Sequence, residues 1–108
     1  MPKFFIQATV TKEGIREVLT KAKGTGVREA VTKFAQSAGG NIDAFYFAFG
    51  PYDAVAIADY PDTVSAVAVS VAASGAGVVH LTMTPLVTAA EMDQAIEKSA
   101  TLAVPGRV

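Results

Sequence analysis

The stretch Ala44–Asp62, AFYFAFGPYDAVAIADYPD, predicts the centre of the fold as a strand, a tight turn, a second strand and a helix start. Two apolar runs, Ala44–Phe49 and Ala54–Ala58, flank the dipeptide Gly50-Pro51. Proline presets φ for a turn and glycine accepts a positive φ, so this dipeptide is typical of a hairpin connection. Asp62 has the side chain of a helix N-cap. We therefore expect an antiparallel hairpin that leads directly into a helix.

The residues before the hairpin predict one strand and one interrupted helix. Apolar residues alternate in Lys3–Val10, which is typical of a half-buried strand. Thr11 is expected to cap a short helix, which Gly24 and Gly26 interrupt. The main helix then covers residues 27–38, with Phe34 as the largest member of its apolar stripe.

The residues after the hairpin predict a helix, a strand and a final helix. The helix that begins at Asp62 is apolar nearly all round, and the pattern favours one buried stripe, made of Val64, Val67, Ala68, Val71 and Ala72. A fourth strand is expected over Val78–Thr84. Thr88 and Glu91 fit a capping box that opens a helix reaching about Leu102.

The order β-α-β-β-α-β predicts an α+β fold of ferredoxin-like topology, with a four-stranded antiparallel sheet in the order 4-1-3-2. Both main helices should cover one face of the sheet. With 108 residues the chain forms a single domain. We expect its core at about residues 3–87, an appended helix at about 88–102 and a frayed tail at 103–108.

The sheet face opposite the helices is expected to be the place of assembly. Alternation places Phe5, Gln7 and Thr9 on this face, beside His80, Thr82 and Thr84. Both parities of the hairpin strands are apolar, so the pattern does not decide which of their residues join the open face. Apolar residues make up 51% of the chain, a high share for a small domain. We therefore expect a second copy to pack against this face.

Composition excludes several classes of protein. A net charge of −1 argues against a dedicated nucleic-acid binder, and the alanines of residues 54–58 do not supply the aromatic platform of an RNA-binding sheet. The most lipid-like segment, residues 66–79, is shorter than the roughly 20 residues of a membrane span. No secretory leader is expected. Because the chain has no cysteine, it has no disulfide, and we place it in the cytoplasm.

Known motifs for cofactors and metals do not match this chain. Gly24-Thr25-Gly26 has Glu29 where a dinucleotide-binding loop needs its third glycine. With one histidine and no cysteine, a zinc site is not expected. His80 with Asp53 and Asp59 would give the ligand types of an iron site, but nothing in the spacing requires one. We expect no metal and no cofactor.

The segment Phe49–Ile57, FGPYDAVAI, followed by Pro61-Asp62, resembles the GYD domain family, which is named for a Gly-Tyr-Asp element at this place. Here Pro51 stands between the glycine and Tyr52. The resemblance covers roughly residues 3–90 and leaves out the last helix. It implies a dimeric α/β-barrel type of fold and no settled activity.

Two functions remain open, and whether the protein is an enzyme stays open with them. In the first, a pocket at the open sheet face binds a small molecule, with His80 as the candidate catalytic residue because its unperturbed pKa lies near neutrality. The candidate ligand-binding residues are Gln7, Thr9, Tyr46, Tyr52, Asp53, His80 and Thr82. In the alternative, the protein is a non-catalytic structural or regulatory oligomerisation module. Asp53 then only accepts backbone N–H groups after the turn, and Tyr52 only packs.

Overall fold

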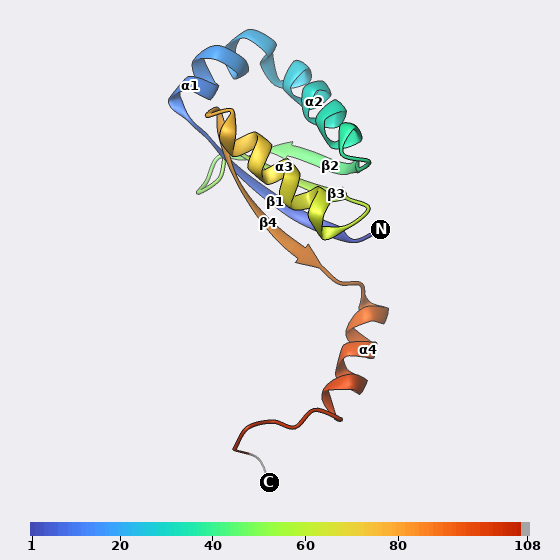
Figure 1. Ribbon diagram of the computed structural model, residues 1–108. Helices are drawn as coiled ribbons and strands as arrows, with labels where there is room; N and C mark the ends of the chain where they lie inside the picture. The colour runs from blue at the N-terminus through green and yellow to red at the C-terminus, as the bar shows by residue number, and fades with distance from the viewer. Residues whose placement is uncertain (107–108) are drawn as a thin grey trace.

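The computed structural model describes residues 1–106, which form one sheet with helices on one face and a helix that projects from the body (Figure 1). The strands are β1 (Lys3–Val10), β2 (Asn41–Phe47), β3 (Ala54–Asp59) and β4 (Val79–Leu86). The helices are α1 (Lys12–Gly14), the π-helical segment η1 (Ile15–Leu19), α2 (Thr20–Ser37), α3 (Thr63–Gly75) and α4 (Ala89–Ser99).

The four strands pair antiparallel in the order β2-β3-β1-β4. Read from β4, this is the order 4-1-3-2 that the sequence predicts. β1 has the predicted bounds, whereas β2 begins earlier and ends at Phe47, and β4 runs on to Leu86. A register shift between Ile42 and Ala44 places Asp43 in a bulge of β2.

The hairpin turns the alanines of β3 and the phenylalanines of β2 toward the helices. Ala54, Ala56 and Ala58 are buried, and Phe45 and Phe47 lie directly opposite Ala56 and Ala54. These positions settle the parity that the apolar pattern leaves open.

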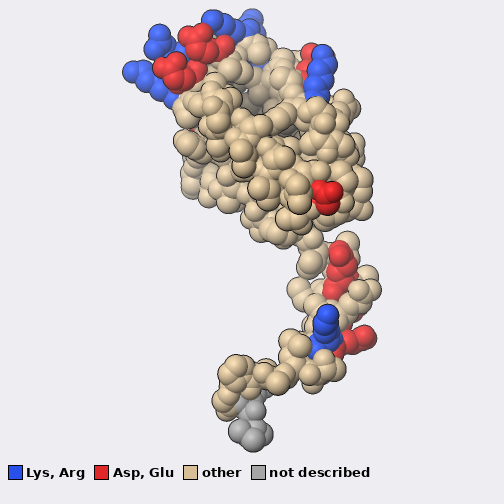
Figure 2. Space-filling view, viewed as in Figure 1, with Lys and Arg blue, Asp and Glu red and all other residues tan. Residues whose placement is uncertain are grey.

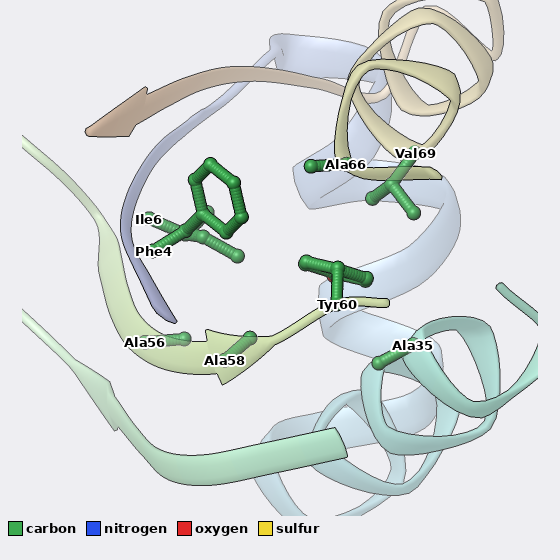
Figure 3. Packing of buried hydrophobic residues seen from close by; sticks show 8 residues of the cluster. All are labelled: Phe4, Ile6, Ala35, Ala56, Ala58, Tyr60, Ala66 and Val69. Carbon is green, nitrogen blue, oxygen red and sulfur yellow. The ribbon is translucent and has the colours of Figure 1, made fainter. Parts of the chain in front are cut away.

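The buried core is small and is centred on two aromatic residues (Figure 3). Phe4 and Tyr60 are both almost fully buried, and their ring centroids lie 6.0 Å apart at an angle of 57°. Aromatic pairs of this tilted kind add stabilisation to the burial of their area. Ala35 of α2 and Ala66 of α3 close the cluster from the helix side.

The predicted buried stripe of α3 is wrong. The residues that face the sheet are Ala66, Val69 and Ala73, while the valines at positions 64, 67 and 71 are 78%, 54% and 66% exposed. Since α3 is apolar on nearly all sides, its sequence does not indicate which side faces solvent. Packing against the sheet decides the orientation of the helix instead. Two small residues on the inner face let the helix lie close to the sheet, which leaves three valines outside.

Thr11 caps the helical connection after β1 as predicted. Its hydroxyl oxygen accepts a hydrogen bond from the Gly14 N–H at 3.0 Å and donates one to the Gly77 carbonyl at 2.8 Å. The interruption expected at Gly24 occurs one residue earlier, at Lys23, where φ is 60° and ψ is −177°. After this kink the helix covers the β2 side of the sheet, with Phe34 still 36% exposed.

α4 leaves the body of the molecule altogether (Figure 1). Thr88 and Glu91 form the predicted capping box, but the helix ends at Ser99, before Leu102, and every residue of it is exposed. The projection lengthens the molecule to 60 × 27 × 23 Å. Of the tail expected to fray, residues 107 and 108 lie outside the described residues. Across residues 1–106, the structure contains no helix with the length and apolar character that crossing a membrane requires.

Candidate functional site

The sheet register brings four of the predicted site residues together on the open face. Thr9 lies directly opposite His80, and Gln7 lies directly opposite Thr82. Thr82 and His80 are exposed in the single chain, whereas Gln7 and Thr9 are half-buried. Within residues 1–106, no carboxylate lies within ion-pairing distance of the His80 ring. The cluster is therefore polar, and none of its members is a carboxylate, lysine or arginine.

The other three predicted site residues lie apart from this cluster. Tyr46 is on the same face but on β2, two strands away, and is 69% exposed. Asp53 follows the turn, where its Oδ2 accepts a hydrogen bond from the Val10 N–H at 2.7 Å and its own N–H donates to the Ala8 carbonyl at 2.8 Å. These bonds give Asp53 the backbone-accepting role expected of it, since it fastens the hairpin to the end of β1. Tyr52 beside it is half-buried.

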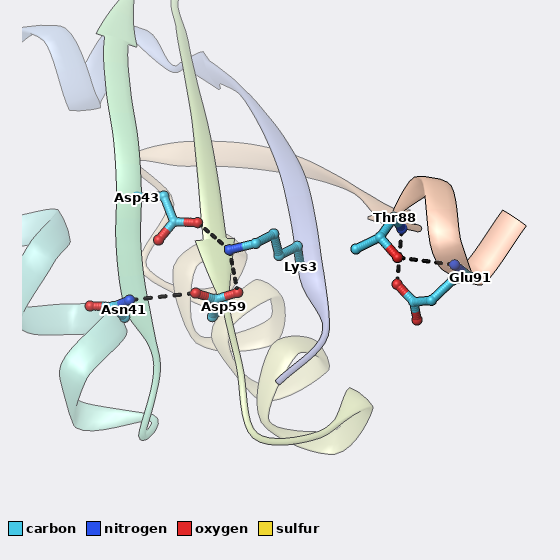
Figure 4. A network of polar contacts seen from close by, with 6 residues as sticks. All are labelled: Lys3, Asn41, Asp43, Asp59, Thr88 and Glu91. Atoms are coloured by element: carbon cyan, nitrogen blue, oxygen red, sulfur yellow. Dashed lines mark hydrogen bonds and ion pairs between the residues drawn. The ribbon is translucent and has the colours of Figure 1, made fainter.

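A charged network occupies the opposite corner of the open face (Figure 4). The Lys3 ammonium donates to carboxylate oxygens of Asp43 and Asp59, and Asn41 donates to Asp59 at 3.4 Å. The two carboxylates raise the pKa of Lys3, and the hydrogen bond from Lys3 lowers the pKa of Asp59. The network joins β1, β2 and β3. Between this corner and His80, the face carries the apolar side chains of Phe5 and Ile57, which lie directly opposite each other.

The main cavity lies on the other side of the sheet, between the sheet and the helices. Its volume is about 400 Å³. The strands contribute apolar side chains such as Ile6, Ala8 and Leu81, and η1 and α2 contribute Val18, Val31 and Phe34. Among all residues that line the cavity, Tyr60 alone carries a polar side-chain group. The arrangement suits a molecule held by burial of apolar surface.

The sheet separates this cavity from His80. Val79 and Leu81 line the cavity, so His80 between them points to the open face. A ligand in the cavity has no histidine or carboxylate among the residues that surround it, because the lining contains none. General acid–base catalysis by His80 would need a separate pocket on the open face.

Tyr60 is not among the site residues predicted from the sequence. A signal for it was present, because Tyr60 continues the alternation of Ala54, Ala56 and Ala58 and so falls on the helix side. Val31 and Phe34 belong to the apolar stripe of the main helix, which the sequence predicts. Nothing in a periodic pattern tells whether such a face is closely packed or bounds a cavity.

Burial raises the pKa of the Tyr60 hydroxyl, which gives the protein a predicted response to alkali. A group whose pKa is higher in the folded state contributes stability below its unfolded pKa of about 10 and loses that contribution as pH rises through the folded pKa. We therefore expect the free energy of unfolding to fall above about pH 10 in wild type. Urea unfolding at a series of pH values checks this, with Tyr60→Phe as control. An equally steep fall in Tyr60→Phe would contradict the assignment.

Within residues 1–106, no group of three or more side chains capable of binding a metal ion is found. Comparisons with curated proteins and with solved structures give no match. A comparison with family profiles matches the GYD domain over residues 4–96. This match reaches into α4, so the expectation that the last helix lies outside the family region is wrong. Since the match spans most of the chain, the protein belongs to the GYD domain family.

Proposed function

We propose that this protein binds a small apolar molecule in the cavity between its sheet and its helices, as a ferredoxin-like, dimeric α/β-barrel type of homo-oligomer. The observation that carries the proposal is the cavity of about 400 Å³ with an almost wholly apolar lining. Binding sites for small molecules typically have volumes of about 300–1,000 Å³ and mostly apolar walls. Interiors of small domains are otherwise closely packed.

The driving force for binding would be the removal of apolar surface from water. A ligand that buries about 200 Å² of apolar surface gains on the order of 5 kcal/mol at about 25 cal/mol per Å². The Tyr60 hydroxyl, as the one polar group in the lining, gives the site a single place for hydrogen bonding. This favours a ligand that is mainly hydrocarbon and carries few polar atoms.

The neutral fluorophore N-phenyl-1-naphthylamine tests the proposal, since its emission rises in apolar surroundings. We expect saturable binding to wild type with one site per chain. Val31→Trp fills the cavity from α2 and should weaken probe binding at least tenfold. Gln36→Trp, on the exposed side of the same helix, should leave binding unchanged.

These two variants also report where each new side chain lies, because the natural chain has no tryptophan. Emission of Val31→Trp should be blue-shifted relative to Gln36→Trp. Thermal unfolding shows whether both variants are folded. Absence of saturable binding to wild type, or equal binding by both folded variants, would overturn the proposal.

A second candidate function is a non-catalytic oligomerisation module that uses the open sheet face. The observation in its favour is the apolar centre of that face, where Phe5 lies directly opposite Ile57. In this case the polar cluster of the open face forms hydrogen bonds with polar groups of the partner copy, and no ligand is needed. The cluster consists of Gln7, Thr9, His80 and Thr82. His80→Ala tests the interface, because His80 lies outside the cavity. Loss of self-association in sedimentation, with probe binding in the cavity unchanged, would identify an interface residue, and unchanged self-association would contradict this second candidate.

A further inference from the structure

The starting observation is that α4 is a well-capped helix whose residues are all exposed within the described part of the chain. It has 11 residues and a complete capping box, in which the Thr88 N–H donates to Glu91 and the Glu91 N–H donates to Thr88. Isolated helices shorter than about 12–15 residues are marginal in water, and most helix stability in proteins comes from packing of an apolar face. Met92 and Ile96, one turn apart on the same side, are nevertheless 48% and 60% exposed.

The body of the same chain has an unoccupied, mostly apolar groove close to the point where α4 begins. A groove of about 310 Å³ runs between α3 and β4, and its walls include Val67 and Val71 of α3 and Met83 and Pro85 of β4. Both valines are more than half exposed. α3 contains no charged residue, and the surface over it is almost free of charge (Figure 2). We call this surface the α3–β4 groove.

We propose that α4 is an exchanged arm, which lies with Met92 and Ile96 in the α3–β4 groove of a second copy of this chain. Only Val87 and Thr88 separate the end of β4 from α4, and α4 continues away from its own groove (Figure 1). A two-fold axis near this short connection brings the groove of the partner copy to the projecting helix. Exchange of an identical element between two copies is an economical route to a dimer, because each arm finds the same groove.

The size of the contact agrees with a specific interface when it is made twice. A helix of 11 residues is about 16 Å long and about 10 Å wide, so one face of it covers a few hundred Å² on each partner. Two reciprocal arms together bury on the order of 1,000 Å², the lower range for a specific interface. Of the three acidic residues of α4, Glu91 belongs to the capping box, and Asp93 and Glu97 lie outside the stripe formed by Met92 and Ile96. The family match extends to Ile96, so the contact residues of the arm lie within the matched region.

Disulfide trapping tests the exchange directly, because the natural chain has no cysteine. Two full-length variants are co-expressed, one with Ile96→Cys on the arm and one with Val67→Cys in the groove, and a longer tag marks one of them. Met92→Cys and Val71→Cys give a second pair. We expect a disulfide-linked heterodimer on non-reducing gels. Gln94→Cys, on the outer side of α4, is the matched control and should give at least tenfold less heterodimer.

The same two positions, changed to cysteine in one chain, distinguish exchange of α4 between two copies from docking of α4 on the groove of its own chain. In a chain that carries both Ile96→Cys and Val67→Cys, an internal disulfide without linked dimers would overturn the proposal in favour of self-docking. Equal trapping by Gln94→Cys, or no disulfide in any combination, would overturn it as well. Val67→Asp changes an exposed residue and should raise the dissociation constant in sedimentation at least tenfold. An unchanged constant would contradict the exchange. Probe binding in the cavity is measured on the same variants, and it tests the proposed function independently.

Discussion

Gly14→Ala should lower the free energy of unfolding by about 3 kcal/mol, the upper end of the usual cost of overpacking, because the added carbon has no space. Gly14 is buried where the chain leaves β1, and a Cβ on it would lie only 2.1 Å from the carbonyl oxygen of Val78 and 2.8 Å from Val10 Cγ1. The carbonyl belongs to the backbone, so no side-chain rotation relieves the clash. The same carbonyl accepts a hydrogen bond from the Thr11 N–H at 3.1 Å. Movement away from the new methyl would therefore weaken the contact between the start of α1 and Val78, which directly precedes β4.

Gly75→Ala is the matched control. Gly75 ends α3, and a Cβ on it would have no neighbour within 4 Å. Alanine in a helix is more favourable than glycine by roughly 0.5–1 kcal/mol, so this variant should be as stable as wild type or slightly more stable. Urea unfolding followed by circular dichroism measures both. If Gly14→Ala is as stable as Gly75→Ala, the end of α1 does not approach Val78 as the structure describes.

The sequence predicts the strands and helix caps well because their signals are local. Thr11, Asp62 and Thr88 each cap the helix expected of them, with hydrogen bonds to backbone N–H groups three residues on. The alternation in Lys3–Val10 correctly separates Phe4 from Phe5, since a strand has only two faces. Such features depend on a few neighbouring residues. They do not depend on what the rest of the chain does.

The orientation of α3 could not be predicted, because it depends on a competition between packing arrangements. Val64, Val67 and Val71 are more hydrophobic than Ala66 and Ala73, and pattern reasoning therefore favoured burying the valines. The sheet instead receives the smaller residues and leaves the valines outside. The apolar excess in the composition predicted that some surface of this kind would exist, without locating it.

The candidate site was predicted only in part for a similar reason. Strand pairing is enough to place Gln7, Thr9, His80 and Thr82 together, and the register does so. The cavity depends on how far the helical layer stands from the sheet, which is set by the whole set of side chains between them. The kink at Lys23, where φ is positive, helps to set the path of α2. Residue preferences do not predict this kink, because lysine rarely adopts a positive φ.

Phe4→Ala and Phe5→Ala should separate the two faces of the sheet, although the residues are adjacent. Phe4 is 5% exposed and packs against Tyr60, so its truncation should cost about 3–5 kcal/mol in the free energy of unfolding. Phe5 lies on the open face opposite Ile57. Truncation of Phe5 should leave the isolated fold nearly unchanged and weaken the association of two copies.

Unfolding measured at two protein concentrations distinguishes these effects. For a protein stabilised by self-association, the unfolding midpoint rises with concentration. Phe4→Ala should lower the midpoint at both concentrations and keep the concentration dependence, since its interface is intact. Phe5→Ala should reduce the concentration dependence. A side chain that stabilises only through the interface contributes to the unfolding midpoint only when a second copy is bound. If both variants lower the midpoint equally and show the same concentration dependence, assembly through this face is contradicted.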